Sequence, residues 1–393
     1  MNFRPSWWLA AVAAAALVAC GGNDPYVPGS GSTQGAPTTK GSFTAVVSFG
    51  DSLSDVGTYA PATSLTQNGQ APYFGGRFST NSATATVWVE NLATQLGLMV
   101  TPAEVGFAGT SVKCPAAASP ALASTCTGYG QGGARITDPA GIGKSGGALT
   151  VPVKTQIANH LARFGSFKSS DLVLLLAGDN DIFVQMGLFA ATAAQVQADA
   201  AAGRITPDQA QLALFQAQST AQAAMKLAAL ELAGYVKDQI IAKGATYVAV
   251  LLTLDPAITP SGNALPADAR GVESALADTF NLWLREGLTG QPVKLIDPNV
   301  LLRDALATPS KYGLVNVSQP TCDADKIKLI TGGRVSDGSS LFCNATPGVV
   351  FNGMRNGADA NTWLFADGVH PTTGGHRMLS NYIAEQLKSF GWI

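Results

Sequence analysis

The chain has 393 residues, of which 46% are hydrophobic, so it is long and apolar enough to bury a large core. Its formal net charge is −2 and its sequence pI is about 5.9. Lys and Arg form no cluster along the sequence and no basic helix face. Because nucleic-acid binding relies on such basic surfaces, we exclude nucleic acid as a partner.

The first twenty residues have the pattern of an export signal. A positive residue, Arg4, precedes the apolar stretch of residues 7–18, and the segment ends in Leu17-Val18-Ala19-Cys20. It is too short for a comfortable membrane span, which favours cleavage. The ending resembles the lipobox of bacterial lipoproteins. Residues 1–19 are therefore predicted to be a lipoprotein signal peptide, and Cys20 the lipid-modified first residue of the mature chain.

This interpretation places the protein in the bacterial cell envelope, at the outer membrane or cell surface, attached to the membrane through its N-terminal lipid. The alternative is an ordinary signal peptide that ends near a cysteine, which would give a secreted protein. Residues 20–42 contain mainly small and turn-forming side chains and are expected to form a flexible tether. No second linker of this kind occurs later in the chain, so residues 43–393 are interpreted as one domain.

An apolar run over residues 44–49 ends in Gly50-Asp51-Ser52-Leu53, which predicts a buried strand followed by a turn into a helix. A serine at such a turn is well placed as a nucleophile, because backbone N–H groups of the turn face the same space. A structural role is compatible with the same pattern. Ser52 would then cap the helix, and Asp55 would complete a capping box with Asp in place of Glu.

Further along the chain, apolar segments alternate with amphipathic or Ala-rich ones. Strands are expected at residues 171–177, 247–252 and 293–296, and helices at residues 82–96, 154–164, 190–243, 267–286 and 374–387. Residues 108–147 read as a loop-rich region. Because the strands are continuously apolar, we predict a three-layer α/β/α sandwich around a mostly parallel sheet, flavodoxin-like, with an Ala- and Gln-rich helical insertion. Chemistry in such sheets gathers at the carboxyl ends of strands, where Ser52 and Asn180 fall.

The remaining cysteines are even in number, which suits disulfide bonds in an exported chain; they are Cys114, Cys126, Cys322 and Cys343. Four cysteines allow three pairings, and closeness in sequence favours 114 with 126 and 322 with 343. No histidine accompanies them at metal-ligand spacing, so we expect no metal site.

Two glycine-rich segments match other motifs. Residues 128–133 fit the G-x-G-x-x-G dinucleotide pattern, but no strand precedes them and Lys154 stands where the ribose-binding acid would be. Residues 143–147 fit the G-x-S-x-G turn of α/β-hydrolases, but residues 137–141 cannot form the buried strand that must precede it. The same Gly-Lys-Ser lacks the upstream glycine of a P-loop. We interpret both segments as loops.

The chain has three histidines, so few residues can act as a general base. His160 lies in an expected helix and His376 in the last one, where solvated or capping roles are the default. His370 differs because Asp367 precedes it by three residues. A turn between them brings the carboxylate to one ring nitrogen and leaves the other free to take a serine proton. An Asx-type turn before a helix is the structural alternative.

Four short blocks occur in order with long spacings: Gly50-Asp51-Ser52-Leu53-Ser54, Gly132-Gly133-Ala134-Arg135, Gly178-Asp179-Asn180-Asp181 and Asp367-Gly368-Val369-His370-Pro371. Together they resemble the four blocks of the GDSL, or SGNH, hydrolase family, and the resemblance covers residues 43–389. Residues 76–81 and 87–90 also resemble the larger esterase branch of that family. One departure is Gly128-Tyr129-Gly130, where many relatives have Asn-Tyr-Ala, so whatever that asparagine bonds to must be missing or replaced.

The resemblance implies a role for each matching residue. Ser52 would be the nucleophile, His370 the general base and acid, and Asp367 its orienting partner. The backbone N–H groups of Ser52 and Gly133 and the side-chain amide of Asn180 would form the oxyanion hole. The implied reaction is hydrolysis of a carboxylic ester, such as a lipid or short-acyl ester, through an acyl-serine intermediate, with no metal or organic cofactor.

Other functions are compatible with the same residues. The site would also suit an acyltransferase or a polysaccharide O-deacetylase, and a tethered domain that has only kept the scaffold would be a surface adhesin. The insertion after Asn180 allows two interpretations. Residues 190–232 would either form a wall or lid over the acyl site or pack away from it as a helical hairpin.

Overall fold

The computed structural model describes residues 43–63 and 75–393. The predicted signal peptide, the tether and Cys20 lie outside these residues, whereas all four sequence blocks lie within them. Across the two described ranges, none of the helices combines the length and the apolar character that crossing a membrane requires.

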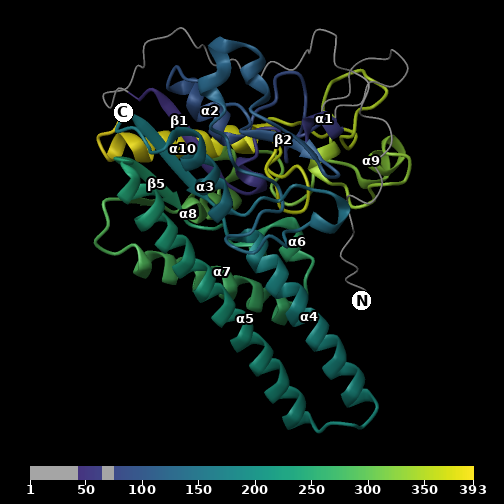
Figure 1. Ribbon diagram of the computed structural model, residues 1–393. Coiled ribbons are helices and arrows are strands. Elements are labelled where there is room, and N and C mark those ends of the chain that lie inside the picture. Colours follow the sequence, from purple (N-terminus) through teal and green to yellow (C-terminus); the bar gives the residue numbers. More distant parts are fainter. Residues whose placement is uncertain (1–42, 64–74) are drawn as a thin grey trace.

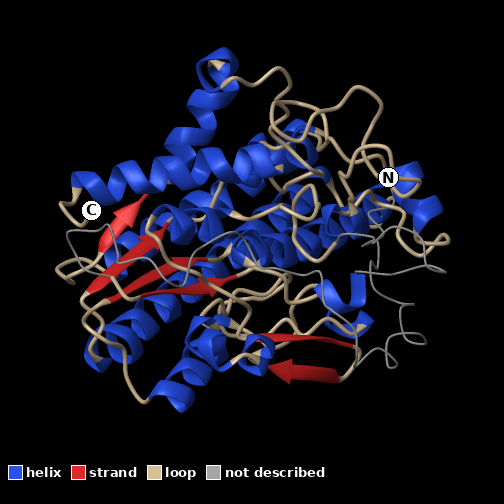
Figure 2. Cartoon of the chain, turned by 90° about the horizontal axis from the view of Figure 1, so that it is seen from above, coloured by secondary structure: helices blue, strands red, loops and turns tan. Residues whose placement is uncertain are grey.

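The centre of the domain is a parallel sheet, in which four described strands have the order β1-β4-β5-β6 (Figure 2). Its strands are β1 (Ala45–Gly50), β4 (Asp171–Leu176), β5 (Tyr247–Leu251) and β6 (Lys294–Ile296). The register pairs Gly50 with Leu176 and Leu176 with Leu251, so the carboxyl ends of three strands meet at one edge. Every residue of β4 is buried, as its continuous apolar run predicts.

Helices cover both faces of this sheet (Figures 1 and 2). One face packs against α3 (Val153–Phe164), α5 (Pro207–Tyr235) and α7 (Ala267–Gly287), and the other against α2 (Trp88–Gln95), α8 (Pro298–Ala307) and α10 (Thr373–Ser389). Side chains of β4 alternate between the two cores: Val173 and Leu175 join the first, Leu172 and Leu174 the second. The predicted three-layer α/β/α fold is confirmed.

Beside β1, a loop takes the place of a further strand. Ser48 in β1 donates to and accepts from the segment 127–129, at 2.9 and 2.8 Å. The N–H of Gln131 then donates to the Gly50 carbonyl at 3.2 Å. The loop therefore runs along the edge of the sheet and carries residues 132–133 to the carboxyl end of β1.

The helical insertion is a long antiparallel hairpin whose outer end projects from the body of the domain (Figure 1). Its first helix, α4 (Asp179–Ala201), begins directly after β4 and not at residue 190. The second, α5, starts at Pro207, because the Thr206 hydroxyl caps it by accepting the Gln209 N–H at 3.2 Å. A π turn and a 3₁₀ turn extend it to Lys243.

Shorter elements differ more from the predictions. Helix α2 begins at Trp88 and not at residue 82, because the Val87 N–H donates to the Glu90 carboxylate at 2.9 Å and closes the helix there. An antiparallel pair of strands is also not predicted: β2 (Glu104–Phe107) lies just before the expected loop region, and β3 (Thr110–Lys113) lies within it. Helix α8 and the short helices α1 (Ala60–Thr63), α6 (Pro260–Asn263) and α9 (Ala324–Ile330) are not predicted by the sequence patterns.

Candidate active site

Ser52 lies directly after β1, at the carboxyl edge of the sheet. It is the first residue of a single 3₁₀ turn, Ser52–Ser54. The residue that caps this turn is Asp51, whose carboxylate accepts the Leu53 N–H at 3.2 Å. The capping alternative for Ser52 is therefore wrong, because Asp51 performs that function and the Ser52 hydroxyl contacts other groups.

Ser52, His370 and Asp367 meet although 318 residues separate the serine from the histidine. His370 Nε2 lies 2.8 Å from Ser52 Oγ, and His370 Nδ1 lies 2.9 and 2.8 Å from the two carboxylate oxygens of Asp367. All three side chains are buried. One ring nitrogen is thus held by a carboxylate while the other faces the hydroxyl, which allows the imidazole to take the serine proton.

Backbone N–H groups hold the Asp367 carboxylate in place. Oδ1 accepts the N–H groups of Val369 and His370 at 3.0 and 2.8 Å, and Oδ2 accepts that of Ser340 at 2.9 Å. Burial alone would raise the pKa of Asp367, but the adjacent His370 and these donors outweigh it and hold the pKa well below its usual range. The carboxylate therefore stays charged wherever the protein is folded at ordinary pH.

The predicted oxyanion donors lie at the same edge of the sheet. Gly133 has φ +80°, and a Cβ there would come within 2.0 Å of the Ile142 carbonyl oxygen, so glycine is required. None of the hydrogen bonds found in the described ranges uses the Gly133 N–H as donor. Asn180 is in the first turn of α4, where its amide donates one hydrogen to the Ala134 carbonyl at 2.9 Å. An amide nitrogen carries two hydrogens, so one is left for a substrate oxygen.

Asp55 ties the nucleophile turn to the oxyanion loop. Its carboxylate accepts the N–H groups of Gly57, Thr58 and Gly132 at 2.9, 2.7 and 2.9 Å. Because the Gly132 N–H is used in this way, Gly133 is the glycine whose N–H is left to bind an oxyanion. Burial raises the pKa of Asp55 to about 6, although the N–H donors oppose the rise.

The loop that departs from the family pattern is held by close backbone packing. A Cβ at Gly128 would lie 2.5 Å from a methyl group of Val56, and one at Gly130 would lie 2.8 Å from the Ser54 carbonyl oxygen. The two glycines let the loop pack directly on the turn that carries the nucleophile.

The other two histidines are buried, and the expectation of solvated or capping roles is wrong for both. His160 stacks on Phe167 with ring centroids 4.3 Å apart, on the face of the sheet that carries α3, and burial lowers its pKa to about 4. His376 Nδ1 accepts the Trp88 N–H at 3.3 Å, and His376 Nε2 lies 3.3 Å from the Phe78 carbonyl oxygen. Burial lowers the pKa of His376 to about 3. Neither ring contacts Ser52.

Residues 76–81 pack against His370 and support the backbone that holds Asp367. The sequence does not predict this role. The Phe78 ring packs 4.9 Å from the His370 ring, centroid to centroid. The Asn81 amide donates to the Ser340 carbonyl at 2.9 Å, and the N–H of the same Ser340 holds Asp367. A buried ion pair between Arg77 and Glu90, at 2.5 Å, fixes the segment to α2.

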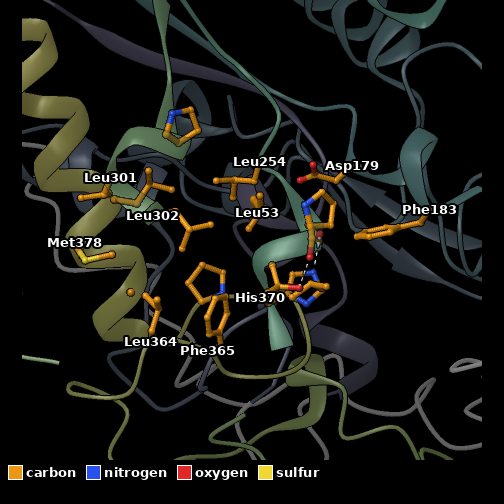
Figure 3. A pocket seen from close by; sticks show the side chains of 18 residues that line it. Leu53, Asp179, Phe183, Leu254, Leu301, Leu302, Leu364, Phe365, His370 and Met378 are labelled. Atoms are coloured by element: carbon orange, nitrogen blue, oxygen red, sulfur yellow. Dashed lines mark hydrogen bonds between the residues drawn. The ribbon is translucent and has the colours of Figure 1, made fainter. Parts of the chain in front are cut away.

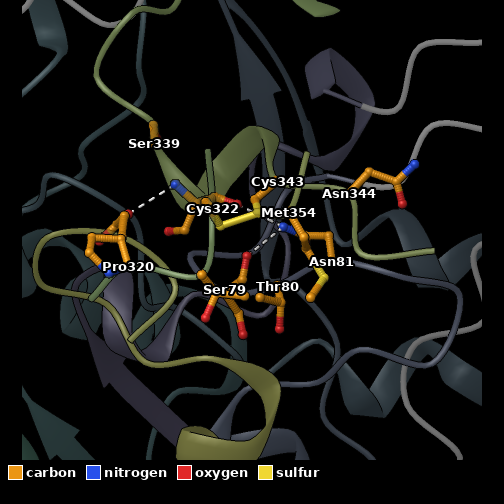
Figure 4. The surroundings of a disulfide bond; sticks show 12 residues. Ser79, Thr80, Asn81, Pro320, Cys322, Ser339, Cys343, Asn344 and Met354 are labelled. Atoms are coloured by element: carbon orange, nitrogen blue, oxygen red, sulfur yellow. Dashed lines mark hydrogen bonds between the residues drawn. A yellow bond between two sulfur atoms is a disulfide. The ribbon is translucent and has the colours of Figure 1, made fainter. Parts of the chain in front are cut away.

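The structure joins Cys114 to Cys126 and Cys322 to Cys343, the two pairings that closeness in sequence favours. The second bond, whose surroundings are shown in Figure 4, lies near Ser339, Asn81 and Met354. Cys343 follows Ser340 by three residues, and the Cys322 N–H donates to the Ala366 carbonyl at 2.8 Å. This disulfide therefore joins the stretch that contains Ser340, which bonds the Asp367 carboxylate, to the stretch at Cys322, which bonds the backbone of Ala366.

Two further acids lie next to the triad. Asp179 lines a cavity beside Ser52, and burial raises its pKa to about 6. Burial and the proximity of Asp179 also raise the pKa of Asp51 well above its usual value. In residues 43–63 and 75–393, no group of three or more His, Cys, Asp or Glu side chains is arranged to hold a metal ion.

The cavity beside Ser52 and His370 has a volume of about 60 Å³ (Figure 3). Most of its wall is apolar and comes from the loop after β5, from α8, from α10 and from the segment before His370. The apolar side chains include Leu254, Leu301, Leu302, Leu364, Phe365 and Met378. A chain of methylene groups next to the nucleophile would be well accommodated here.

The helical insertion contributes to this cavity only through its first turns. Asp179 and Phe183 line the cavity, but no residue from 190–232 does. The outer part of the hairpin projects away from the body (Figure 1). The structure therefore favours the second interpretation of residues 190–232, a helical hairpin that packs away from the site, over a lid on the acyl site.

The sequence matches the family model described as GDSL-like Lipase/Acylhydrolase over residues 46–383, a range that contains Ser52, Gly133, Asn180, Asp367 and His370. The chain belongs to this family. Its members are acylhydrolases, so membership supports an enzyme that hydrolyses ester bonds. The larger esterase blocks that the sequence resembles fall within the matched region.

Curated relatives match part of the chain. Esterase EstA from Pseudomonas aeruginosa is 31% identical over 147 residues, which is 37% of this chain and 20% of the relative, and Esterase EstA from Pseudomonas putida gives the same values. An uncharacterized protein in the trpE-trpG intergenic region of Pseudomonas putida is 32% identical over 151 residues, 38% of this chain and 22% of that protein. The matches span about a fifth of the length of these relatives.

Proposed function

We propose that the protein hydrolyses carboxylic esters through an acyl-serine intermediate on Ser52. The observation that carries this proposal is the continuous set of contacts from Ser52 Oγ through His370 to Asp367, at 2.8 Å for Oγ to Nε2 and for Nδ1 to Oδ2. Membership of an acylhydrolase family supports the same class of reaction.

In the first half of the reaction, Ser52 Oγ attacks the ester carbonyl carbon while His370 Nε2 takes the serine proton. The carbon–oxygen bond to the alcohol then breaks, and His370 gives the proton to the leaving alcohol. The charged Asp367 stabilises the imidazolium that exists between these steps. In the second half, His370 takes a proton from water as the water oxygen attacks the acyl carbon. The bond from Ser52 Oγ to that carbon then breaks, His370 returns the proton to Ser52 Oγ, and the carboxylic acid is released.

The oxyanion of each tetrahedral intermediate would be bound by the N–H groups of Ser52 and Gly133 and by the Asn180 amide. These donors are uncharged and fixed by the loop beside β1 and by α4, so little reorganisation is needed as charge develops. The apolar cavity supports an ester with an apolar acyl group, such as a lipid or short-acyl ester, because the wall next to the triad offers methylene and methyl groups.

A fluorophosphonate probe and a panel of p-nitrophenyl esters test this proposal. We expect the probe to label Ser52, located by peptide mass spectrometry, and Ser52→Ala to lose both the label and ester turnover. Ser54→Ala is the matched control, because Ser54 is a buried serine two residues away that makes no contact with His370. Thermal unfolding shows that each variant is folded. Wild-type turnover in folded Ser52→Ala would overturn the assignment.

We also propose that the chain is exported and anchored through a lipid on Cys20. The pattern Leu17-Val18-Ala19-Cys20 and the disulfides support this, since disulfides persist in oxidising compartments. Mass spectrometry of the mature N-terminus should find a lipid-modified Cys20, and Cys20→Ser should release the protein from the membrane fraction. A mature chain that begins elsewhere and carries no lipid would favour the secreted alternative.

A further inference from the structure

Two cavities near the triad share one wall. The inner cavity, of about 60 Å³, contains Ser52 and His370 in its lining. An outer groove of about 440 Å³ lies on the surface between α8 and α10 and the segment around Tyr312. Two side chains, Met378 and Leu301, line both spaces. They therefore stand between the catalytic cavity and the outer groove.

The wall lies at the end of the inner cavity that is remote from the nucleophile. In Figure 3, Met378 and Leu301 are on the opposite side of the cavity from His370. Met378 comes from α10 and is partly exposed, whereas Leu301 comes from α8 and is buried. An acyl chain that starts at Ser52 and runs along the apolar lining would meet this wall with its methyl end.

The size of the inner cavity limits the chain that fits in front of the wall. The inner cavity is small, at about 60 Å³, whereas the outer groove is larger, at about 440 Å³. Short acyl chains therefore fit in front of the wall, and longer chains need the space that lies beyond Met378.

We propose that Met378, together with Leu301, sets the acyl-chain length that the enzyme accepts. With the wall in place, short apolar acyl groups fill the inner cavity and are preferred. Without the Met378 side chain, the inner cavity is continuous with the outer groove and takes medium and long acyl chains. This inference rests on the proposed ester hydrolysis at Ser52 and names the substrate class for that site.

The test is the dependence of kcat/KM on acyl length for p-nitrophenyl esters of two to twelve carbons, in the wild type and in Met378→Ala. One methylene in a hydrophobic pocket is worth about tenfold or more in kcat/KM. We expect the ratio of the ten-carbon to the four-carbon ester to rise at least about tenfold in Met378→Ala. Met378→Leu nearly conserves the volume and should keep the wild-type ratio.

Met186→Ala is the matched control. It makes the same chemical change in the core on the opposite face of the sheet, and Met186 lines neither cavity. This variant should lose stability and leave the chain-length ratio unchanged. If Met378→Ala is unfolded at the assay temperature, Leu301→Ala is used instead, because Leu301 is the other side chain that lines both spaces. It should also raise the ratio of kcat/KM for the ten-carbon ester to that for the four-carbon ester.

An unchanged ratio in a folded wall variant overturns the inference about Met378 while leaving ester hydrolysis intact. A wild-type protein that neither reacts with the fluorophosphonate nor hydrolyses any ester of the panel overturns the proposed function instead. The two failures are therefore distinguishable in one set of measurements.

Discussion

The two sides of Ser52, named here the oxyanion side and the acid–base side after their proposed roles, are held in place by different means. On the oxyanion side, Ser52 follows β1, Asn180 follows β4, and a loop bonded along β1 supplies Gly133. On the acid–base side, Asp367 and His370 belong to a loop segment that no strand of the sheet supports. The Ser340 N–H, which donates to the Asp367 carboxylate, and the nearby disulfide of Cys322 and Cys343 fix it instead.

Because of this difference, we expect substitutions on the two sides to have different effects on catalysis and on stability. Donors mounted on the sheet keep their positions as long as the core is folded, so changes there should alter catalysis more than stability. The acid–base side depends on a few local links. Loss of such a link should therefore displace the catalytic acid and destabilise the loops together.

The largest expected effect is on the acid–base side itself. Asp367→Asn keeps the size of the side chain but removes the charge that selects the tautomer of His370. A fall in kcat of about 10⁴-fold is expected, with little change in KM. Steady-state kinetics measure it, and near-UV circular dichroism shows whether the fold is kept. A fall of less than about tenfold in a folded variant would contradict the role of Asp367.

The next effect is on the oxyanion side. Asn180→Ala removes one uncharged donor near the nucleophile, and kcat is expected to fall by about 10²- to 10³-fold. The fluorophosphonate should still label Ser52, only more slowly, because the nucleophile and its base are unchanged. Asn263→Ala, at the C-terminal end of α6 and outside the cavity, provides the control. Equal kcat values for Asn180→Ala and Asn263→Ala would exclude Asn180 as an oxyanion donor.

Asp55→Asn tests the link between the nucleophile turn and the oxyanion loop. The amide cannot accept all three N–H groups, so residues 132–133 should shift slightly, and kcat should fall by about 10- to 100-fold at nearly constant KM. Asp323→Asn is matched, because Asp323 also accepts two backbone N–H groups but caps the distant helix α9. A role of Asp55 in stability alone would lower unfolding temperature without this change in kcat.

The smallest catalytic effect should come from the disulfides, and it should differ between them. Replacing Cys322 and Cys343 by Ser is expected to lower kcat by up to about tenfold, because the Ser340 donor to Asp367 loses its fixed position. Replacing Cys114 and Cys126 should leave kcat unchanged. Each pair of substitutions should cost about 3 kcal/mol in the free energy of unfolding. Identical kinetics for the two double variants would remove the distinction between the two sides of the site.

Much of the fold can be predicted from the sequence because the central strands are continuously apolar and end in recognisable turns. The β2–β3 pair cannot, since all of β3 is exposed and its side chains show no apolar alternation. The start of α4 at Asp179 is indicated by the sequence, but the same residues are also typical of a turn. Gly178 precedes Asp179 and Asp181, and acids in the first turn of a helix are stabilised by its dipole.

In the site, the triad and the oxyanion residues stand in short motifs and can be selected from sequence. Ser340 cannot, because it contributes a backbone N–H that every residue except proline possesses. The function of Asp55 is also hidden, since an acid three residues after a serine has an ordinary interpretation in helix capping. Only the fold shows that its carboxylate reaches the Gly132 N–H.

The loop that runs along β1 has a consequence for how the molecule behaves in a crowded solution. An uncovered edge strand offers N–H and C=O groups on which another chain can add a strand and begin to aggregate. Residues 127–131 occupy that edge at β1, and the opposite edge, β6, has three residues and begins with an exposed Lys294. The loop that leads to Gly133 thus keeps this edge of the sheet from pairing with a strand of another molecule.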